Sequence, residues 1–181
     1  IYGNFTTIEE VIRNNMIVDE GDPFNEILFN KSINKIKNLR IFKKVDSKII
    51  EGSSPNTKIL NLSVEEQPTG EISLGAGVGT SGTVISGGIS ENNFLGKGIK
   101  LDSNLQFSQD SVKGSLTYIK PYFNYTDNTL STKIRSTTED NLSDFGYKIS
   151  TLGLSMGTEI EQYENLFFSP EIDFTTEDLK T

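Results

Sequence analysis

The residues whose spacing most suggests chemistry are three glycines near the middle of the chain. Gly77, Gly79 and Gly82 match the pattern Gly-x-Gly-x-x-Gly. In dinucleotide-binding proteins this pattern forms a turn, and the amides of the helix that follows hold a pyrophosphate. The segment that follows here, Thr83–Ile89, is β-branched and broken by two glycines. A helix is not expected there, so the sequence argues against dinucleotide binding.

Other catalytic chemistry has few candidate residues. The 181 residues include no Cys and no His. This excludes thiolate and imidazole metal ligands, nucleophiles activated by His, and disulfide bonds. The paired carboxylates Asp19–Glu20 and Glu65–Glu66 are interpreted as solvated charges of a turn and of a strand end. We therefore expect neither an enzyme nor a cofactor or metal site.

The charge and hydropathy of the chain argue against several classes of partner and of membrane segment. The formal net charge of −8 argues against nucleic acid and against electrostatic docking on an anionic membrane surface. No apolar run is long enough for a transmembrane helix, and no signal peptide opens the chain. The start, Ile1–Asn4, is typical of a strand end, so we expect the chain to be a fragment.

The first part of the sequence, residues 1–67, predicts a small α+β module of order β-α-α-β-β. Thr6 and Glu9 form a capping-box pattern for a first short helix. Pro23 suits the start of a second helix. Strands are predicted at about Val45–Ile50 and at Lys58–Glu66, with a turn at Gly52–Asn56 between them. The second helix has one apolar face, made of Phe29, Ile33, Ile36 and Leu39.

Several spaced elements of this module resemble a POTRA domain. They are a Gly-Asn strand end in Ile1–Thr7, a Val-Ile-Arg helix segment at Val11–Arg13, a Gly-Asp before the second helix in Gly21–Phe24, and the exit Leu39–Val45. The resemblance covers nearly all of residues 1–67 and implies the POTRA fold.

From residue 68 on, the sequence alternates apolar and polar residues in about seven runs, clearest at Ile99–Phe107. The alternation changes phase near Ser150 or Thr151, which predicts a β-bulge, and the last run, Leu166–Phe174, is interrupted by Pro170. A soluble sandwich and a transmembrane β-barrel both fit such a pattern. Runs of about 8 to 11 residues and polar residues in mid-strand favour the barrel. So does the alternation of long polar connections with short ones, which are predicted at Asn92–Gly98 and Glu161–Asn165.

Three further motifs resemble the junction between POTRA domain and barrel in the BamA-type family of the bacterial surface antigen superfamily. They are Glu66–Gly70 (E-x-x-T-G), Asn93–Gly98 (N-F-L-G-K-G) and Pro121–Phe123 (P-Y-F). The resemblance implies a POTRA domain at 1–67 with a truncated first strand. It also implies, at 68–181, the antiparallel N-terminal strands of an incomplete barrel. A periplasmic location for the first part and an outer-membrane location for the second follow from it.

The family resemblance also implies a function and candidate site residues. A protein of this family folds and inserts other β-barrel proteins, with unfolded clients, lipoprotein subunits and outer-membrane lipid as partners. The implied client-pairing edge consists of Val45, Asp46, Ser47, Lys48, Ile49 and Ile50. The implied lateral-gate strand consists of Ile72, Ser73, Leu74, Gly75, Ala76, Gly77 and Val78. The implied hinge between the POTRA domain and the barrel consists of Pro68, Thr69 and Gly70.

Two other functions stay open at this stage. A protein-secretion transporter of the same superfamily would carry one or two POTRA domains upstream, whereas an assembly factor would carry four or five. A soluble β-rich binding or adhesion module would keep the strand region in solution without detergent. For the glycines of Ile72–Val78, weakened strand pairing and room for packing neighbours are both compatible with the sequence.

Overall fold

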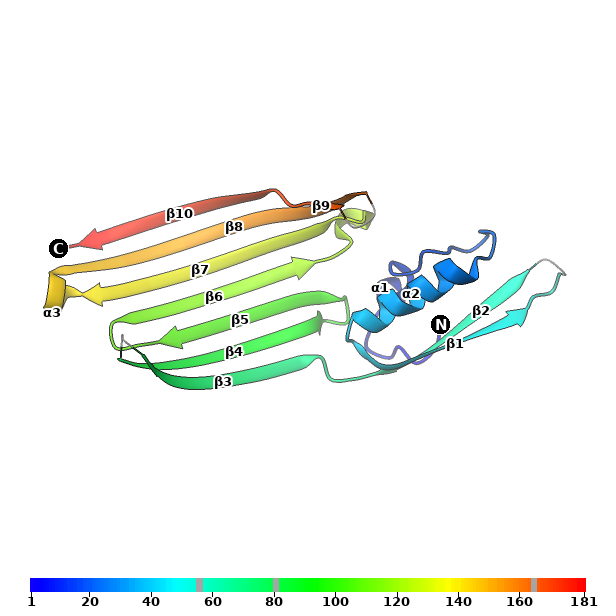
Figure 1. Cartoon of the computed structure of the whole chain (residues 1–181), viewed down its shortest axis with the longest axis horizontal. Coiled ribbons are helices and arrows are strands. Elements are labelled where there is room, and N and C mark those ends of the chain that lie inside the picture. The colour runs from blue at the N-terminus through cyan, green and yellow to red at the C-terminus, as the bar shows by residue number, and fades with distance from the viewer. Residues whose placement is uncertain (55–56, 80–81, 164–165) are drawn as a thin grey trace. The chain divides into compact units, whose positions relative to one another are not determined.

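The computed structural model describes residues 1–54, 57–79, 82–163 and 166–181, and the chain divides into two units (Figure 1). The α/β unit comprises Ile1–Thr69 and Asn92–Gly98, and the strand unit comprises Gly70–Glu91 and Ile99–Thr181. The chain therefore passes between the units after Thr69, after Glu91 and after Gly98. Within the described part of the chain, no helix has the length and apolarity needed to cross a membrane.

The α/β unit contains two helices and a two-stranded hairpin. The helices are α1 (Glu9–Arg13) and α2 (Glu26–Asn38), and the strands are β1 (Phe42–Glu51) and β2 (Lys58–Glu66). Ahead of α1, Tyr2 makes a parallel bridge with Ser63 on β2. The predicted turn at Gly52–Asn56 includes Pro55 and Asn56, which lie outside the described residues.

The core of the α/β unit forms where the apolar face of α2 meets the hairpin. Phe29, Ile33 and Ile36 are buried, and Leu39 packs against the cluster from a partly exposed position. These four residues are the stripe predicted from helical spacing. The other buried members of the cluster are Val11, Ile12, Ile41, Phe42, Val45, Leu62 and Val64.

The predicted capping box at the start of α1 is wrong. The N-cap residue is Ile8, without a side-chain cap, and Glu9 pairs with Arg13 at 2.6 Å rather than reaching back. The first amides of a helix need acceptors, and here distant segments supply them. The Ile8 amide donates to the carbonyl of Gly96 at 2.9 Å, which replaces the local cap.

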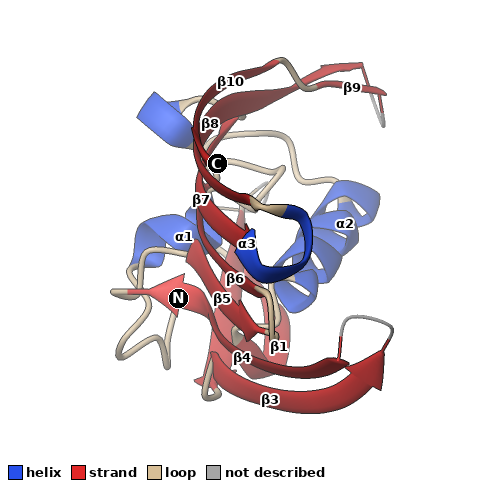
Figure 2. Cartoon of the chain, turned by 90° about the vertical axis from the view of Figure 1, so that its left-hand side faces the viewer, coloured by secondary structure: helices blue, strands red, loops and turns tan. Residues whose placement is uncertain are grey.

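The strand unit is one open antiparallel sheet whose strands lie side by side (Figure 1). Its strands are β3 (Gly70–Gly79), β4 (Gly82–Phe94), β5 (Ile99–Phe107), β6 (Ser111–Lys120), β7 (Thr129–Asn141), β8 (Tyr147–Tyr163), β9 (Leu166–Phe168) and β10 (Glu171–Lys180). A 3-10 turn, η1 (Phe123–Tyr125), joins β6 to β7, and α3 (Leu142–Phe145) joins β7 to β8. The order is β10-β8-β7-β6-β5-β4-β3, with β9 paired only to β8. The sheet curves from β3 to β10 when viewed along the strands (Figure 2).

Strand register confirms the predicted alternation of faces. Directly paired residues lie on the same face of a sheet. On one face, consecutive partners across four strands are Leu116, Ile134, Leu154 and Phe174. On the other face, the corresponding partners are Ser115, Arg135, Gly153 and Thr175. The sheet therefore has an apolar face and a polar face.

The bulge predicted near Ser150 is wrong. β8 pairs with β7 in unbroken register from Tyr147↔Asn141 to Glu159↔Thr129. The apolar residues change face along β8 without an extra residue, so Tyr147 lies on the polar side, where its ring is 6.4 Å from that of Phe145. The predicted final run is split at Pro170 into β9 and β10, and the short connection expected at Glu161–Asn165 includes residues 164–165, which are not described.

Candidate functional site: two strand edges and the junction beside them

The predicted client-pairing residues form the outer edge of the hairpin in the α/β unit. β2 is paired on one side with β1 and on the other with Tyr2, whose amide donates to the Leu62 carbonyl at 2.9 Å. β1 is paired with β2 alone among the described residues. The backbone of Val45–Ile50 therefore presents one edge without a strand partner in this part of the chain.

The side chains of this edge change character along β1. Val45 is buried in the core, whereas the residues of 46–49 are exposed and Ile49 keeps 38% of its surface accessible. Lys44 pairs with Asp46 on the same strand, and hydrogen bonding to that carboxylate raises the pKa of Lys44. Charged side chains on an edge oppose uncontrolled pairing between sheets, while the backbone groups stay available.

The predicted gate strand, Ile72–Val78, lies within β3 at one edge of the strand unit. β3 pairs with β4 over its whole length, from Gly70↔Glu91 to Gly79↔Gly82, and has no second partner among the described residues. All of β3 is exposed, with Leu74 at 87% and Val78 at 86%. The opposite edge of the sheet is β10.

The glycines of β3 have different surroundings. A Cβ added to Gly75 would lie 2.8 Å from Oγ of Ser86, so this position is restricted by its neighbour on β4. A Cβ added to Gly77 or Gly79 would meet no atom within 4 Å. Packing within the described chain therefore does not require these two glycines, which favours the interpretation that they weaken the strand. Gly77, Gly79 and Gly82 lie in strands β3 and β4, with no helix after Gly82, as expected.

The predicted hinge, Pro68–Gly70, lies at the first passage between the units. Thr69 is the last residue of the α/β unit in this segment, and Gly70 begins β3. Before the hinge, the Gln67 amide donates to the Ile41 carbonyl at 3.1 Å. Within the hinge, the Thr69 carbonyl accepts a bond from the Asn92 amide at 3.2 Å. One backbone hydrogen bond therefore precedes the hinge and another is made by its middle residue.

Glu66, at the end of β2, is not the solvated charge that the sequence suggested. Its carboxylate accepts hydrogen bonds from the amide of Thr7 at 2.6 Å and from the amide of Thr6 at 3.0 Å. Burial by itself raises the pKa of Glu66, but the hydrogen bonds from Thr7 and Thr6 outweigh it, so the pKa lies below the ordinary value. Its neighbour Glu65 does behave as an exposed charge and pairs with Lys43 at 3.0 Å.

The turn Asn92–Gly98 belongs to the α/β unit, although it joins β4 to β5. Asn93 is buried and donates from Nδ2 to Oγ1 of Thr7 at 2.9 Å. Its Oδ1 accepts from the amide of Gly98 at 2.8 Å, which closes the turn. Sequence reasoning predicted a tight turn here but missed its partners. The only signal for them is the co-occurrence of the E-x-x-T-G and N-F-L-G-K-G motifs.

The polar face of the strand unit carries one ordered cluster across three strands. Arg135 of β7 pairs with Asp173 of β10 and donates to Oγ of Ser155 on β8 at 3.1 Å. Ser155 is buried and donates to Asp173 at 3.1 Å. No group of three or more Asp, Glu, His or Cys with metal-binding geometry occurs among the residues that were placed. The cluster therefore links strands and offers no evident site for chemistry.

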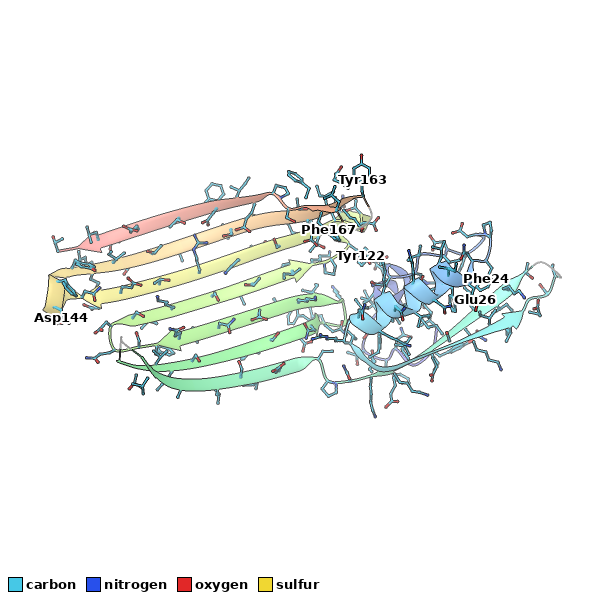
Figure 3. All side chains as sticks on the ribbon, viewed as in Figure 1. Phe24, Glu26, Tyr122, Asp144, Tyr163 and Phe167 are labelled. Atoms are coloured by element: carbon cyan, nitrogen blue, oxygen red, sulfur yellow. The ribbon has the colours of Figure 1, made fainter. Side chains whose placement is uncertain are left out.

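Aromatic residues gather at one end of the strand unit. Tyr122, Tyr163 and Phe167 lie at the same end in Figure 3, away from Asp144 of α3 at the other end. Tyr163 and Phe167 are exposed, at 74% and 53%. The pKa of Tyr122 is raised by burial and by the charges of Asp127 and Glu161. Such a group of aromatic side chains suits a membrane–water interface.

Comparison with known proteins finds similarity to one superfamily of outer-membrane proteins. The model of the Omp85 superfamily domain matches residues 93–180. The outer membrane protein assembly factor BamA of Neisseria meningitidis serogroup B is 28% identical over 176 residues, which cover 93% of this chain and 22% of that protein. A putative outer membrane protein assembly factor of Treponema pallidum is 32% identical over 129 residues, 68% of this chain and 15% of that protein. The chain therefore spans about a fifth or less of the length of these relatives.

Solved structures agree with this relationship. The crystal structure of BamA from Haemophilus ducreyi lacking POTRA domains 1–3 matches 99% of this chain and 35% of that one, with a TM-score of 0.84 and 25% identity. CdiB from Acinetobacter baumannii matches 96% of this chain and 35% of that one, with a TM-score of 0.61 and 17% identity. The second likeness shows a shared fold alone.

Proposed function

Because residues 93–180 form an Omp85 superfamily domain, we propose that the chain is part of an outer-membrane assembly factor of the BamA type. In this proposal the α/β unit is the POTRA domain next to the barrel, and the strand unit holds the first strands of that barrel. The observation that carries the proposal is the exposed edge of β3, which follows the α/β unit directly at Gly70.

The α/β unit would receive unfolded client strands on β1. A client strand that adds to the free edge of Val45–Ile50 gains main-chain hydrogen bonds whatever its side chains are. The hairpin already holds β1 in extended geometry through its register with β2. The conformational entropy lost on binding is therefore mainly that of the client strand. This is consistent with a function that must accept many sequences.

The strand unit would act through β3 as a lateral gate. β3 pairs with the closing strand of the full barrel only weakly, because its polar face carries glycines at positions 75, 77 and 79. A client strand can then replace the closing strand and pair with the edge of β3. The protein acts as a foldase and insertase, and no bond of the client is made or broken, so it is not an enzyme.

Location and partners follow from the same proposal. The strand unit lies in the outer membrane with its apolar face, including Leu116, Ile134, Leu154 and Phe174, toward lipid. The α/β unit lies in the periplasm. Its partners are unfolded outer-membrane proteins and the lipoprotein subunits of an assembly machinery.

A secretion transporter of the same superfamily is the second candidate, because the fold is shared with CdiB. The number of POTRA domains before Ile1 separates the two functions. One or two would favour the transporter, and four or five the assembly factor.

The gate is tested by locking β3 in the full-length protein. These 181 residues contain no Cys, so a cysteine on β3 and one on the closing strand form a single defined disulfide once any cysteine elsewhere in the full-length protein has been replaced by Ser. We expect the oxidised protein, in vesicles, to lose client assembly and the reduced protein to regain it. The control places both cysteines on the central strands β6 and β7, at Thr117 and Lys133, which are direct partners. Undiminished assembly by the oxidised β3-locked protein would refute the gate.

A further inference from the structure

Two turns that connect neighbouring strands carry exposed apolar side chains. The turn Asn92–Gly98 joins β4 to β5, and residues 121–128 join β6 to β7. Because successive strands run in opposite directions, both connections leave the sheet at the same end (Figure 1). We propose that Leu95 and Phe123 anchor these turns in the membrane surface, and that the lysine beside each selects phospholipids with an anionic headgroup. This inference rests on the outer-membrane location given under the proposed function.

The backbone of both turns adopts an unfavourable conformation. Among the described residues, four that are not glycine have positive φ, and three of them lie in these two turns: Leu95 at 56°, Tyr122 at 52° and Asn124 at 55°. Asparagine tolerates this left-handed region, whereas a leucine there costs free energy that a glycine would not. Such strain commonly accompanies a functional position. The conformation of the first turn therefore favours glycine or asparagine at position 95, and a leucine there has a reason outside the turn.

The apolar side chains of the turns are open to solvent. Leu95 is 68% exposed, Phe94 beside it 39% and Phe123 in the second turn 43%. Apolar side chains of this size are unfavourable in water and favourable at the boundary between headgroups and acyl chains. The exposed side chains therefore fit a partner with an apolar layer below a polar surface.

The strands joined to the turns identify that partner as lipid. The apolar face of the sheet includes Tyr118 on β6 and Leu130 on β7, which precede and follow the second turn. On the proposed function this face contacts lipid, so the lipid-facing surface continues along the chain into the turn. Tyr122, Tyr163 and Phe167 at the same end of the sheet suit a membrane–water interface (Figure 3). The position of a turn at this end follows from its covalent connection to the strands.

A lysine adjoins the apolar side chain of each turn. Lys97 is exposed and follows Leu95 by two residues, and Nζ of Lys120 lies 5.7 Å from the ring centroid of Phe123. In the part of the chain that the structure describes, neither ammonium group has a carboxylate partner. A lysine stem can lie along apolar groups while its ammonium group reaches the headgroups, where it attracts negative charge. The net charge of −8 opposes general docking on an anionic surface, so this attraction is confined to the turns.

Fluorescence quenching in the full-length protein tests the anchors. Leu95→Cys or Phe123→Cys, with any cysteine elsewhere replaced by Ser, carries an environment-sensitive fluorophore in vesicles of phosphatidylcholine and phosphatidylglycerol. We expect a nitroxide near the lipid headgroup to quench both labels several-fold more strongly than iodide in the water does. Labels quenched only from the water would overturn the anchors. Labels shielded from both quenchers would identify a protein partner instead and would overturn them equally.

A third label separates this inference from the proposed function. Leu116 lies on the apolar face of β6, so a fluorophore at Leu116→Cys reports insertion of the strand unit. If lipid nitroxides quench the label at 116 but not those at 95 and 123, the anchors fail and the proposed location stands. If the label at 116 is not quenched either, the proposed location itself fails.

The phospholipids retained by the purified full-length protein test headgroup selection. Lys97→Gln and Lys120→Gln should each lower the retained ratio of phosphatidylglycerol to phosphatidylcholine several-fold, because each removes one cation from the membrane surface. Lys97→Arg should keep the wild-type ratio. Lys133→Gln is the matched control, because it removes a lysine from the polar face of β7, opposite Thr117. A wild-type ratio in both turn variants would overturn the selection of anionic lipid. Since lipid is measured rather than client assembly, the result is the same for an assembly factor and for a transporter.

Discussion

Glu66 binds the backbone amides of Thr6 and Thr7, which precede it by 60 and 59 residues. This contact connects the end of β2 with the segment that leads to α1. The carboxylate holds that segment in place but caps no amide of α1, because Thr6 and Thr7 precede the N-cap residue Ile8. Two motifs that looked independent in the sequence, T-T-I and E-x-x-T-G, therefore meet at one place.

Replacing Glu66 by Gln should destabilise the α/β unit by about 1 to 3 kcal/mol at neutral pH, because hydrogen bonds to a charged acceptor are lost. The pKa of Glu66 is lowered in the folded protein from its ordinary 4.5. The stabilisation is therefore complete above about pH 4.5 and is lost as the pH falls through the folded pKa. Urea unfolding from pH 7 to pH 3 should show the difference between wild type and variant shrinking. Glu65→Gln, at the exposed neighbour, should have the same free energy of unfolding as wild type over this pH range.

Two isoleucines of α2 offer a matched pair for the core. Ile36 has no exposed surface, whereas Ile27 is 71% exposed. Ile36→Ala should lower the free energy of unfolding of the α/β unit by about 2 to 5 kcal/mol, since it leaves a cavity beside the hairpin. Ile27→Ala should change it by less than about 0.5 kcal/mol. Hydrogen exchange of the Leu62 backbone amide measures the free energy of unfolding in both variants. Similar effects of the two substitutions would contradict the assigned core.

The client edge can be tested by site-specific photo-crosslinking. A crosslinker at Ser47 on β1 should capture an unfolded outer-membrane protein during assembly. The same crosslinker at Ser63 on β2 should not, because Ser63 is flanked by Asp46 on one side and by Tyr2 on the other. Both serines are exposed, so accessibility to the probe is matched. Equal capture at the two positions would argue against pairing at the β1 edge.

The glycines of β3 give a prediction about the gate. A Cβ added at position 77 meets no atom within 4 Å, so we expect Gly77→Val to fold. A β-branched residue favours the strand state, and we expect it to strengthen pairing with the closing strand and to slow client assembly several-fold. Ala76→Val, on the apolar face opposite Ile85, is the control in the same strand. The measurement is the rate of client assembly in vesicles with each variant. A wild-type rate for Gly77→Val would count against the hypothesis that the glycines weaken the pairing of β3.

Sequence reasoning predicted the features that depend on neighbouring residues. The alternation in Ile99–Phe107 and the stripe from Phe29 to Leu39 each follow from the geometry of one element. The rejection of a nucleotide loop at Gly77–Gly82 also rested on local propensity. In contrast, the partners of Glu66 and of Asn93 lie 60 and 86 residues away, and no local pattern indicates them. The capping box at Thr6 failed for this reason, because a distant carbonyl took its place.

The α/β unit consists of two segments that are separated in the sequence, Ile1–Thr69 and Asn92–Gly98, and this affects the order of folding. A chain is synthesised from its N-terminus, so Thr69 emerges before β3 and β4, and the turn Asn92–Gly98 emerges only with the end of β4. The buried hydroxyl of Thr7 and the amide of Ile8 therefore gain their partners, Asn93 and Gly96, only after β3 and most of β4 have been synthesised. The α/β unit can therefore be complete only after β3 and β4 have been synthesised.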